Sequence, residues 1–183
     1  MKLLLHICCA PCTVFSLDAF RAEGFDPVGL FYNPNIHPLA EYRRRLEALK
    51  TYAGSQGLPV RIGEGWPVEL WLRAVAGREG PERCRYCYRL RLEQAAEVCA
   101  DEGLARFSTT LLYSKFQRHE WVREEGERAA ELHKVEFIYR DLRLGWKEGL
   151  RRTRELAIYR QRYCGCLLSE RERFLGTGFV GPG

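Results

Sequence analysis

Short apolar runs alternate with longer amphipathic stretches along most of the chain. The runs predict five strands, at 2–8, 27–32, 58–62, 107–112 and 135–139. The first of them, Lys2–Cys8, is apolar on both alternating sets of positions, which is typical of a strand buried on both faces of a sheet. Apolar residues at helical spacing predict helices at 13–23, 39–56, 66–76, 82–100 and 118–133, and we expect the remainder to be mostly helical.

Strand and helix follow one another in strict succession, which predicts a single α/β domain built on a parallel sheet with helices on both faces. We expect its core over about residues 1–140 and a helical C-terminal segment over about 141–175. Ligands of such sheets bind outside the carboxyl ends of the strands. The segments 8–12, 33–35 and 111–114, which follow three strands, are therefore expected to converge on one rim.

The composition is that of a folded, water-soluble chain. Of its 183 residues, 46% are hydrophobic and 29% are charged. No apolar run approaches the ~18 residues that a membrane-spanning helix needs. The apolar stretch at the start is too short for an export signal and lacks a small-residue cleavage site. We therefore expect a cytoplasmic protein with no membrane partner.

The charge is moderately basic, +5 at neutral pH. Arginines gather at Arg43, Arg44 and Arg45, around residues 83–91, and over 151–162. A solvated helix face explains any one of these groups. Two of them flank cysteines, however, which favours an anionic partner such as nucleic acid approaching the same place. We take Arg43, Arg44 and Arg45 as candidate phosphate contacts.

Cysteines carry the strongest chemical signal. The chain has eight, and seven of them form three tight groups: Cys8, Cys9 and Cys12; Cys84 and Cys87; Cys164 and Cys166. In a reducing cytoplasm such groups indicate metal binding or catalysis rather than structural disulfides. The eighth, Cys99, stands alone on the apolar side of a predicted helix and is interpreted as packing.

The spacing of the cysteines indicates which kind of metal or redox site they form. Cys9–Cys12 and Cys84–Cys87 are two C-x-x-C units far apart in the chain, a pattern typical of a tetrathiolate metal site. Seven thiols are too many for one zinc ion, although zinc stays a competing metal. Four would hold one cubane iron–sulfur cluster. The remaining three could bind a second metal, or Cys164 and Cys166 could cycle between dithiol and disulfide.

Aromatic, amide and imidazole side chains follow the predicted strands at the same rim, and they could contact a substrate: Tyr32, Asn33, Asn35, His37, Tyr42 and Tyr113. Unpaired bases stack on aromatic faces, and extruded nucleotides are recognised by hydrogen-bonding side chains. Each tyrosine by itself could equally be a half-buried amphipathic residue. Of the other histidines, His6 is expected to pack within the sheet, and His119 and His133 to lie on the surface.

Five motifs follow one another in order along nearly the whole chain: His6–Cys12 (HICCAPC), Tyr32–Pro38 (YNPNIHP) with Glu41 and Tyr42, Arg83–Arg91 (RCRYCYRLR), Ser108–Leu112 (STTLL) and Tyr159–Cys166 (YRQRYCGC). Together they resemble the QueH-type epoxyqueuosine reductases. The five together are specific, whereas any one alone would not be.

The resemblance implies a Rossmann-like fold of the HUP or PP-loop kind and a [4Fe–4S] cluster. It implies an oxidoreductase that reduces epoxyqueuosine to queuosine at the wobble position of tRNA, the last step of queuosine biosynthesis, with electrons from an unidentified donor. By the same resemblance Cys8, Cys9, Cys84 and Cys87 are the cluster ligands. Cys164 and Cys166 then resemble a redox-active pair, or ligands of an adjacent mononuclear iron shared with Cys12.

Removing an epoxide oxygen as water needs two electrons and two protons, and hence a general acid, for which Tyr32, Glu41 and Tyr42 are the candidates. Two other classes of function stay open. An ATP-dependent PP-loop enzyme would need a phosphate loop where residues 8–12 stand. A zinc-binding RNA adaptor would be colourless and would turn over no substrate.

Overall fold

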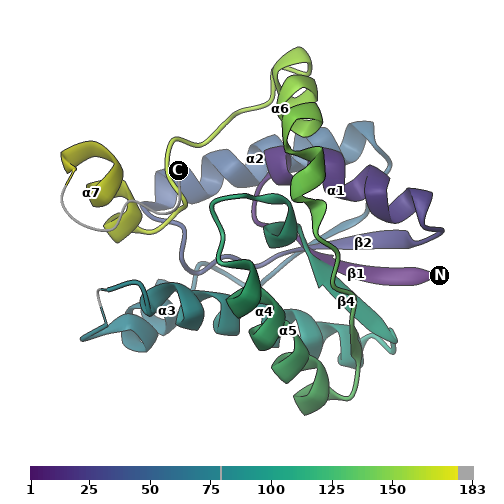
Figure 1. Ribbon diagram of the computed structural model, residues 1–183, viewed down its shortest axis with the longest axis horizontal. Coiled ribbons are helices and arrows are strands. Elements are labelled where there is room, and N and C mark those ends of the chain that lie inside the picture. The colour runs from purple at the N-terminus through teal and green to yellow at the C-terminus, as the bar shows by residue number, and fades with distance from the viewer. Residues whose placement is uncertain (79, 177–183) are drawn as a thin grey trace.

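The computed structural model describes residues 1–78 and 80–176. Its centre is a five-stranded sheet in the order β3-β2-β1-β4-β5, and every neighbouring pair is parallel (Figure 1). The strands are β1 Lys2–His6, β2 Asp26–Phe31, β3 Val60–Ile62, β4 Arg106–Thr109 and β5 Glu136–Phe137. The expected α/β architecture with a parallel sheet is confirmed.

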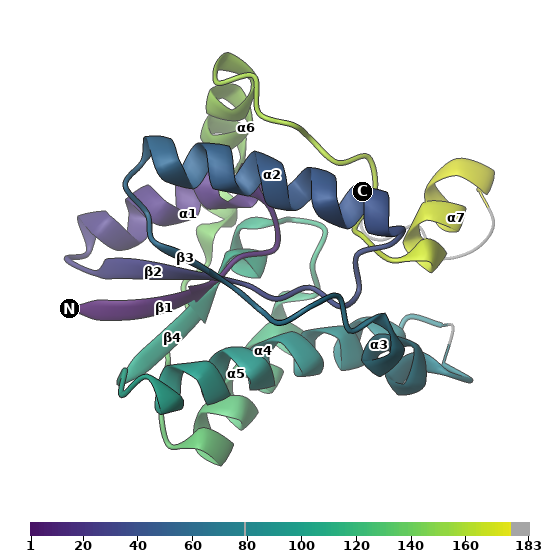
Figure 2. The same cartoon turned by 180° about the vertical axis from the view of Figure 1, so that it is seen from behind.

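Helices cover both faces of this sheet. They are α1 Ala10–Ala22, α2 Leu39–Ser55, α3 Val68–Val75, α4 Arg83–Asp101, α5 His119–His133, α6 Trp146–Glu155 and α7 Leu167–Leu175. Helices α1 and α2 lie on one face, and α4 and α5 on the other (Figures 1 and 2). Helix α7 projects at one end of the molecule, beside the start of α2.

The first strand joins the two halves of the core. Leu3 and Leu5 pack into the cluster under α1 and α2, and Leu4 packs into the cluster under α4 and α5. All three side chains are fully buried. Alternate residues of a strand point to opposite faces, so a strand covered on both sides must be apolar at every position. This confirms the reading of Lys2–Cys8 as a doubly buried strand, although β1 itself ends at His6.

Two predicted elements end differently in the structure. The predicted strand over 107–112 stops at Thr109, and Thr110–Tyr113 forms a 3₁₀ turn. The Thr109 hydroxyl accepts a hydrogen bond from the Leu111 backbone N–H at 3.1 Å, which favours the turn over further pairing. The C-terminal part is less helical than expected, because residues 156–166 between α6 and α7 contain no helix.

The histidines divide between the sheet and its edges. His6 is buried, as expected, and its ring nitrogens contact the Thr109 hydroxyl at 2.8 Å and the Tyr32 carbonyl at 3.2 Å. The surface prediction was wrong for His119, which is buried with Nε2 at 3.3 Å from the Ser114 carbonyl. His133 is half-buried. In the described part of the chain, no helix has the length and apolar character to cross a bilayer.

Candidate metal and redox centre

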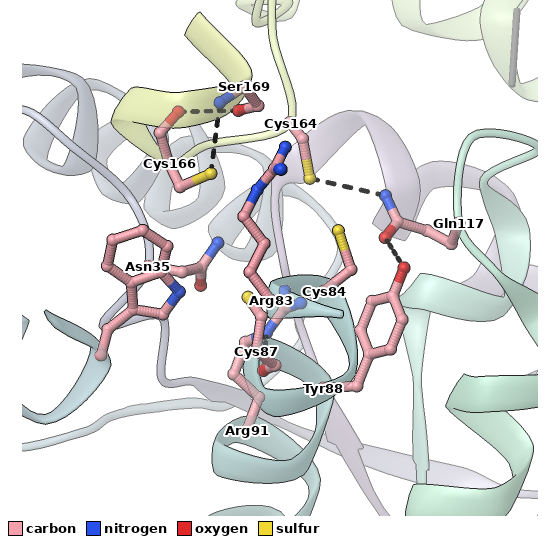
Figure 3. A pocket seen from close by; sticks show the side chains of 11 residues that line it. Asn35, Arg83, Cys84, Cys87, Tyr88, Arg91, Gln117, Cys164, Cys166 and Ser169 are labelled. Atoms are coloured by element: carbon pink, nitrogen blue, oxygen red, sulfur yellow. Dashed lines mark hydrogen bonds between the residues drawn. The ribbon is translucent and has the colours of Figure 1, made fainter. Parts of the chain in front are cut away.

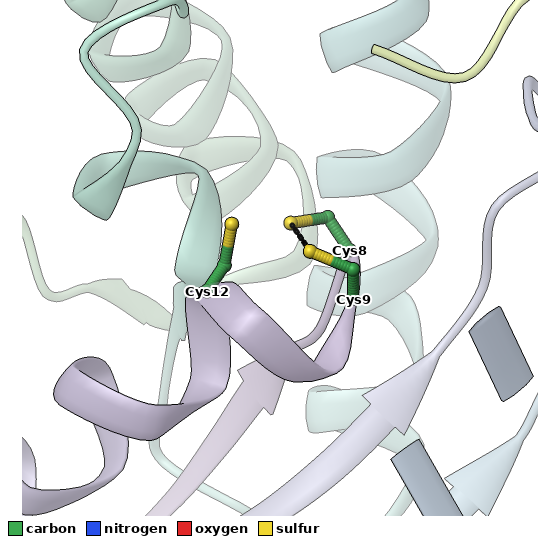
Figure 4. A group of neighbouring side chains, drawn as sticks. All are labelled: Cys8, Cys9 and Cys12. Carbon is green, nitrogen blue, oxygen red and sulfur yellow. Dashed lines mark hydrogen bonds between the residues drawn. The ribbon is translucent and has the colours of Figure 1, made fainter. Parts of the chain in front are cut away.

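Cys8, Cys9 and Cys12 lie together at the carboxyl end of β1 (Figure 4). Their sulfur atoms are all within 4.8 Å of one another, so the three could hold a metal ion. The strand ends at His6, and Pro11 opens α1 after an extended Cys9. This strand-to-helix turn is what gathers three thiols that are close in sequence, and we call them the N-terminal trio.

The trio is arranged to carry negative charge on Cys9. Hydrogen bonds from the thiols of Cys12 and Cys8 hold the pKa of Cys9 well below its usual range, and the charge of Arg45 acts in the same direction. Hydrogen bonds to Cys8 and Cys9, together with burial, raise the pKa of Cys12 well above its usual range. The side-chain amide of Gln161 also donates to Cys9 Sγ, at 3.0 Å.

The other four clustered cysteines line one small pocket (Figure 3). Cys84 and Cys87 come from the first turns of α4, whereas Cys164 and Cys166 come from the segment that leads into α7. We call these four the pocket quartet. Burial is the largest cause that raises the pKa of both Cys84 and Cys87 to about 12. A bound metal ion would replace those protons, since thiols ligate as thiolates.

Two buried arginines border the quartet. Arg83 and Arg91 each have only 2% of their surface exposed. Arg83 pairs with Glu172 at 2.6 Å, and Arg91 Nε donates to the Cys87 carbonyl at 2.9 Å. The charge of Arg91 acts on the sulfurs of Cys87, Cys164 and Cys8, and so on members of both thiol groups. A buried cation in this position offsets the charge of thiolates around it.

Some buried polar atoms that line the quartet pocket lack hydrogen-bond partners. Arg91 Nη2 and Asn35 Oδ1 are buried and have no hydrogen-bond partner among residues 1–78 and 80–176. Leaving such groups unpaired costs free energy, which is a mark of sites that receive a ligand. Tyr88 also lines the pocket, and its hydroxyl donates to Gln117 Oε1 at 2.9 Å. Gln117 Nε2 in turn contacts Cys164 Sγ at 3.7 Å.

The model of one protein family, "Epoxyqueuosine reductase QueH", matches residues 3–172. The chain belongs to this family. Its relatives include epoxyqueuosine reductases QueH of Dehalococcoides mccartyi, 38% identical over 94% of both chains, and of Thermotoga maritima, 39% identical over 93% of this chain and 91% of the relative. The family is one of oxidoreductases, as its name states.

A solved structure resembles the fold at much lower sequence identity. It is described as a predicted subunit of tRNA methyltransferase from Methanocaldococcus jannaschii. The TM-score is 0.55 at 13% identity, over 85% of this chain and 74% of that one. At this identity the likeness shows the fold alone, and it agrees with the Rossmann-like expectation.

The sequence predicted that several residues at the rim contact the substrate, and the structure gives most of them structural bonds. Asn33 Nδ2 donates to the Ile7 carbonyl at 2.9 Å, and the Tyr113 hydroxyl donates to the Trp146 carbonyl at 3.0 Å. His37 is buried, with Nε2 at 3.1 Å from the Pro34 carbonyl. Of the predicted substrate residues, Asn35 is the one that lines the quartet pocket.

The three candidate general acids do not line the quartet pocket. Glu41 pairs with Arg45 at 2.7 Å and accepts a hydrogen bond from the Tyr159 hydroxyl at 2.7 Å, so both of its carboxylate oxygens are already engaged. The Tyr42 hydroxyl donates to the Gly65 carbonyl at 3.3 Å. Tyr32 packs in the core under α4, and burial raises its pKa. Glu41 and Tyr42 thus have partners outside the quartet pocket, and an acid role for the three residues stays a prediction.

The three consecutive arginines at 43–45 differ in exposure and in their partners. Arg43 and Arg44 are exposed, as a phosphate contact would require. Arg45 is buried, and its guanidinium donates to the backbone carbonyls of Cys164 at 2.7 Å and Tyr163 at 3.1 Å. The prediction of a phosphate contact is therefore wrong for Arg45, because its donors are already used inside the protein.

Arg91 and Tyr88 are the site residues that sequence reasoning missed as individuals. Both lie on α4, one turn after a cysteine of the second C-x-x-C unit: Tyr88 follows Cys84 by four residues, and Arg91 follows Cys87 by four. Residues four apart share a helix face, so this spacing is a signal that could have found them. Cys99 is buried with Sγ donating to the Leu104 carbonyl at 3.3 Å, as expected for a packing residue.

Proposed function

We propose that this chain reduces epoxyqueuosine to queuosine at the wobble position of tRNA, in the cytoplasm, as the last step of queuosine biosynthesis. Membership in the QueH family supports the substrate. The observation that carries the chemistry is the arrangement of seven thiols in two groups that a buried arginine adjoins. A centre of this kind is suited to moving electrons rather than to hydrolysis or group transfer.

We assign the [4Fe–4S] cluster to Cys8, Cys9, Cys84 and Cys87. The chemistry of the donors supports this assignment, because thiolates are the ligands that these clusters prefer. Cys8 and Cys9 lie just before α1, and Cys84 and Cys87 lie in the first turns of α4. Arg91 fits as well, since its charge acts on both Cys8 and Cys87. When bound, the cluster supplies electrons to the reaction one at a time.

Cys12, Cys164 and Cys166 remain for a second redox role. Oxidising the Cys164–Cys166 dithiol to a disulfide releases two electrons and two protons. That is what converts an epoxide into an alkene and water, so the balance closes without another reactant. The alternative is that these three thiols bind a second iron. Cys164 is exposed and Cys166 is buried, so Cys164 is the sulfur that a substrate could approach.

The proton donor then has to be sought in the quartet pocket. The lining thiols and hydroxyls belong to the cysteines, Tyr88 and Ser169, and the Ser169 hydroxyl already donates to the Cys166 carbonyl at 2.7 Å. Burial, the largest cause, raises the pKa of Tyr88, which keeps the phenol protonated. We therefore expect the chain's own thiols or Tyr88, rather than Glu41 or Tyr42, to deliver the protons.

The test is an anaerobic turnover assay. The protein is reconstituted with iron and sulfide, given a chemical reductant, and incubated with tRNA that carries epoxyqueuosine. Nucleoside mass spectrometry is expected to show queuosine, with about four irons or more per chain. A loaded cluster without queuosine would contradict the substrate. A colourless protein that holds only zinc and gives no turnover would favour an RNA-binding adaptor instead.

A further inference from the structure

A second pocket adjoins the segment that carries Cys164 and shares no lining residue with the quartet pocket. Its volume is about 250 Å³, against about 30 Å³ for the quartet pocket. The second pocket is therefore by far the roomier of the two. Three elements form it: the start of α2, residues 159–163, and α7.

The walls of this pocket combine aromatic rings with guanidinium groups. The guanidinium carbon of Arg44 lies 5.2 Å from the Tyr159 ring centroid, and that of Arg162 lies 4.9 Å from the Phe174 centroid. The Tyr163 and Phe174 rings meet edge to face at 6.4 Å. Aromatic faces beside arginines are the features with which proteins hold unpaired nucleotides, by stacking on the base and pairing with the phosphate.

Both arginines are available for an anion. Arg44 and Arg162 are exposed, and within the described ranges neither forms an ion pair with a carboxylate. The carboxylate of Glu41, which also lines the pocket, is occupied by Arg45 and the Tyr159 hydroxyl. Glu170 is the other acidic residue of the lining. A carboxylate there can accept a hydrogen bond from a base N–H, as Asp and Glu do with base amino groups.

The two pockets are connected through the backbone. Tyr163 lines the second pocket, and the next residue, Cys164, lines the quartet pocket. Their Cα atoms are about 3.8 Å apart, as consecutive residues are. Arg45 holds both carbonyl groups, so the wall between the pockets is fixed from behind. An RNA strand that presents one nucleotide to Cys164 therefore passes its neighbour over Tyr163.

We propose that this second pocket binds the unpaired nucleotide next to the modified one in the anticodon loop. Its base packs against Phe174 and Tyr163, and its phosphate pairs with Arg44 and Arg162. The proposal rests on the proposed function in one respect, namely that tRNA is the substrate. It adds a recognition site outside the cysteine centre, one that would orient the loop so that the wobble base enters at the thiols.

Binding of unmodified RNA tests this site separately from the reaction. The probe is a fluorescent anticodon stem–loop, with copies that carry a single abasic residue at each loop position, and the reconstituted full chain is titrated by anisotropy. Phe174→Ala is expected to weaken binding of the intact loop by about fivefold to hundredfold, as loss of one stacked base does. Leu132→Ala, an exposed position on α5, is the matched control and leaves binding unchanged.

The abasic series locates the nucleotide. With the residue beside the wobble position removed, we expect the wild-type protein to lose about as much affinity as Phe174→Ala loses, and the variant to lose no more. Every other abasic position should weaken both proteins by the same factor. Phe174→Ala changes an exposed side chain at the end of α7, so folding of the variant can be checked by its unchanged thermal midpoint.

Salt dependence tests the phosphate. The double variant Arg44→Gln and Arg162→Gln is expected to lower the slope of log affinity against log salt by about 0.7, because the two arginines neutralise one phosphate and each neutralised phosphate of a single strand contributes about 0.7. Arg123→Gln on α5 is the control for a lost surface charge; Arg123 is exposed and pairs with Glu127 within its helix.

The proposal is overturned if Phe174→Ala and the wild type lose affinity equally for every abasic loop, or if the wild type does not bind the stem–loop. Failure of the proposed function looks different. It would leave the abasic coupling intact while tRNA carrying epoxyqueuosine stays unreduced. If the protein forms queuosine but Phe174→Ala and the abasic loops weaken binding independently, the proposed function stands and the role of this pocket in binding a nucleotide is contradicted.

Discussion

The N-terminal trio and the Cys164–Cys166 pair present thiols at the same end of the molecule with very different support. The trio sits where β1 passes into α1, and Cys9 and Cys12 are buried in the core beneath α1 and α2. The pair sits on residues 156–166, a segment without a helix. Regular backbone structure positions the first group, and individual long-range bonds position the second.

Those bonds can be named. The Cys164 carbonyl accepts from Arg45 at 2.7 Å, the Gly165 carbonyl accepts from the His37 backbone N–H at 2.8 Å, and the Gly165 N–H donates to the Ser169 hydroxyl at 3.2 Å. Each partner comes from another part of the chain or from the start of α7. Buried polar residues of the QueH motifs thus hold the second thiol group in place, while the fold itself holds the first.

The largest expected effect comes from the trio. Cys9→Ser removes the thiol that bears the negative charge, and we expect it to abolish queuosine formation and to lower the iron content after reconstitution. Cys99→Ser is the matched control, because Cys99 is a buried packing residue outside both thiol groups, with its Sγ donating to the Leu104 carbonyl. Iron analysis and the turnover assay measure the two effects. Full iron content and full turnover in Cys9→Ser would contradict the assignment of Cys9 as a cluster ligand.

Arg45→Met is expected to cost about 3–5 kcal/mol of unfolding free energy, because it leaves the Glu41 carboxylate buried without its partner. It also frees the carbonyls of Tyr163 and Cys164, so Cys164 should react faster with an alkylating reagent in the folded protein. Arg43→Met, at an exposed position, should stay within about 0.5 kcal/mol. Urea unfolding measures the change in stability, and the alkylation rate measures the exposure of Cys164. Equal losses of unfolding free energy in Arg45→Met and Arg43→Met would contradict the role of Arg45 in holding the Cys164–Cys166 segment.

The α4 cysteines take their support from α5 through Glu125. Burial by itself would raise the pKa of Glu125, but hydrogen bonds from Arg89, Arg85 and Arg128 lower it to about 2. A carboxyl with a lowered pKa stabilises the fold fully above its unfolded value of about 4.3 and loses that contribution as the pH falls toward 2. It is worth about 2–3 kcal/mol at pH 7.

Glu125→Gln should therefore be less stable than the wild type by about that amount at pH 7, and the difference should shrink steadily between pH 5 and pH 2. Urea unfolding at a series of pH values measures it. Glu127→Gln, which removes an exposed carboxylate paired with Arg123, should cost no more than about 0.5 kcal/mol. A pH-independent difference for Glu125→Gln would show that charge pairing is not the cause.

The smallest expected effect on stability and turnover comes from substituting Gly165, the glycine between Cys164 and Cys166. Gly165 has φ of +156°, and a Cβ there would lie 3.1 Å from Asn35 Nδ2. Gly165→Ala should cost about 1–3 kcal/mol from backbone strain, and it should slow turnover by displacing Cys164. Gly57→Ala is the control, because its φ is +59° in open space. It should be destabilising but leave turnover per folded molecule unchanged, and the same loss of turnover in both would contradict the account.

The sequence predicts the regular half of this protein well, for physical reasons visible in particular residues. Leu3, Leu4 and Leu5 must be apolar together only if β1 is covered on both faces, and that requirement yields the parallel sheet. The rim follows from the sheet, so the locations of Cys8, Cys9 and Asn35 could be expected. Cys84 and Cys87 were recognised by spacing and lie at the start of α4, as expected.

The irregular half could not be predicted in the same way. Nothing in the local pattern around Arg45 or Glu41 says that their partners are Cys164 and Tyr159, more than a hundred residues away. Periodicity reports which face of an element is buried, but not which polar group it meets there. For that reason exposed phosphate contacts and general acids were inferred at positions where the structure has buried hydrogen bonds.

A single-turnover experiment tests the central claim, that the clustered thiols form one centre that reduces epoxyqueuosine. The reconstituted protein is reduced, freed of reductant under anaerobic conditions, and mixed with tRNA carrying epoxyqueuosine. Nucleosides and free thiols are then counted by mass spectrometry after alkylation. The account predicts a burst of queuosine, with loss of two alkylatable thiols at Cys164 and Cys166 if they act as the redox pair. A fully loaded, reduced protein that leaves the epoxide untouched would contradict it.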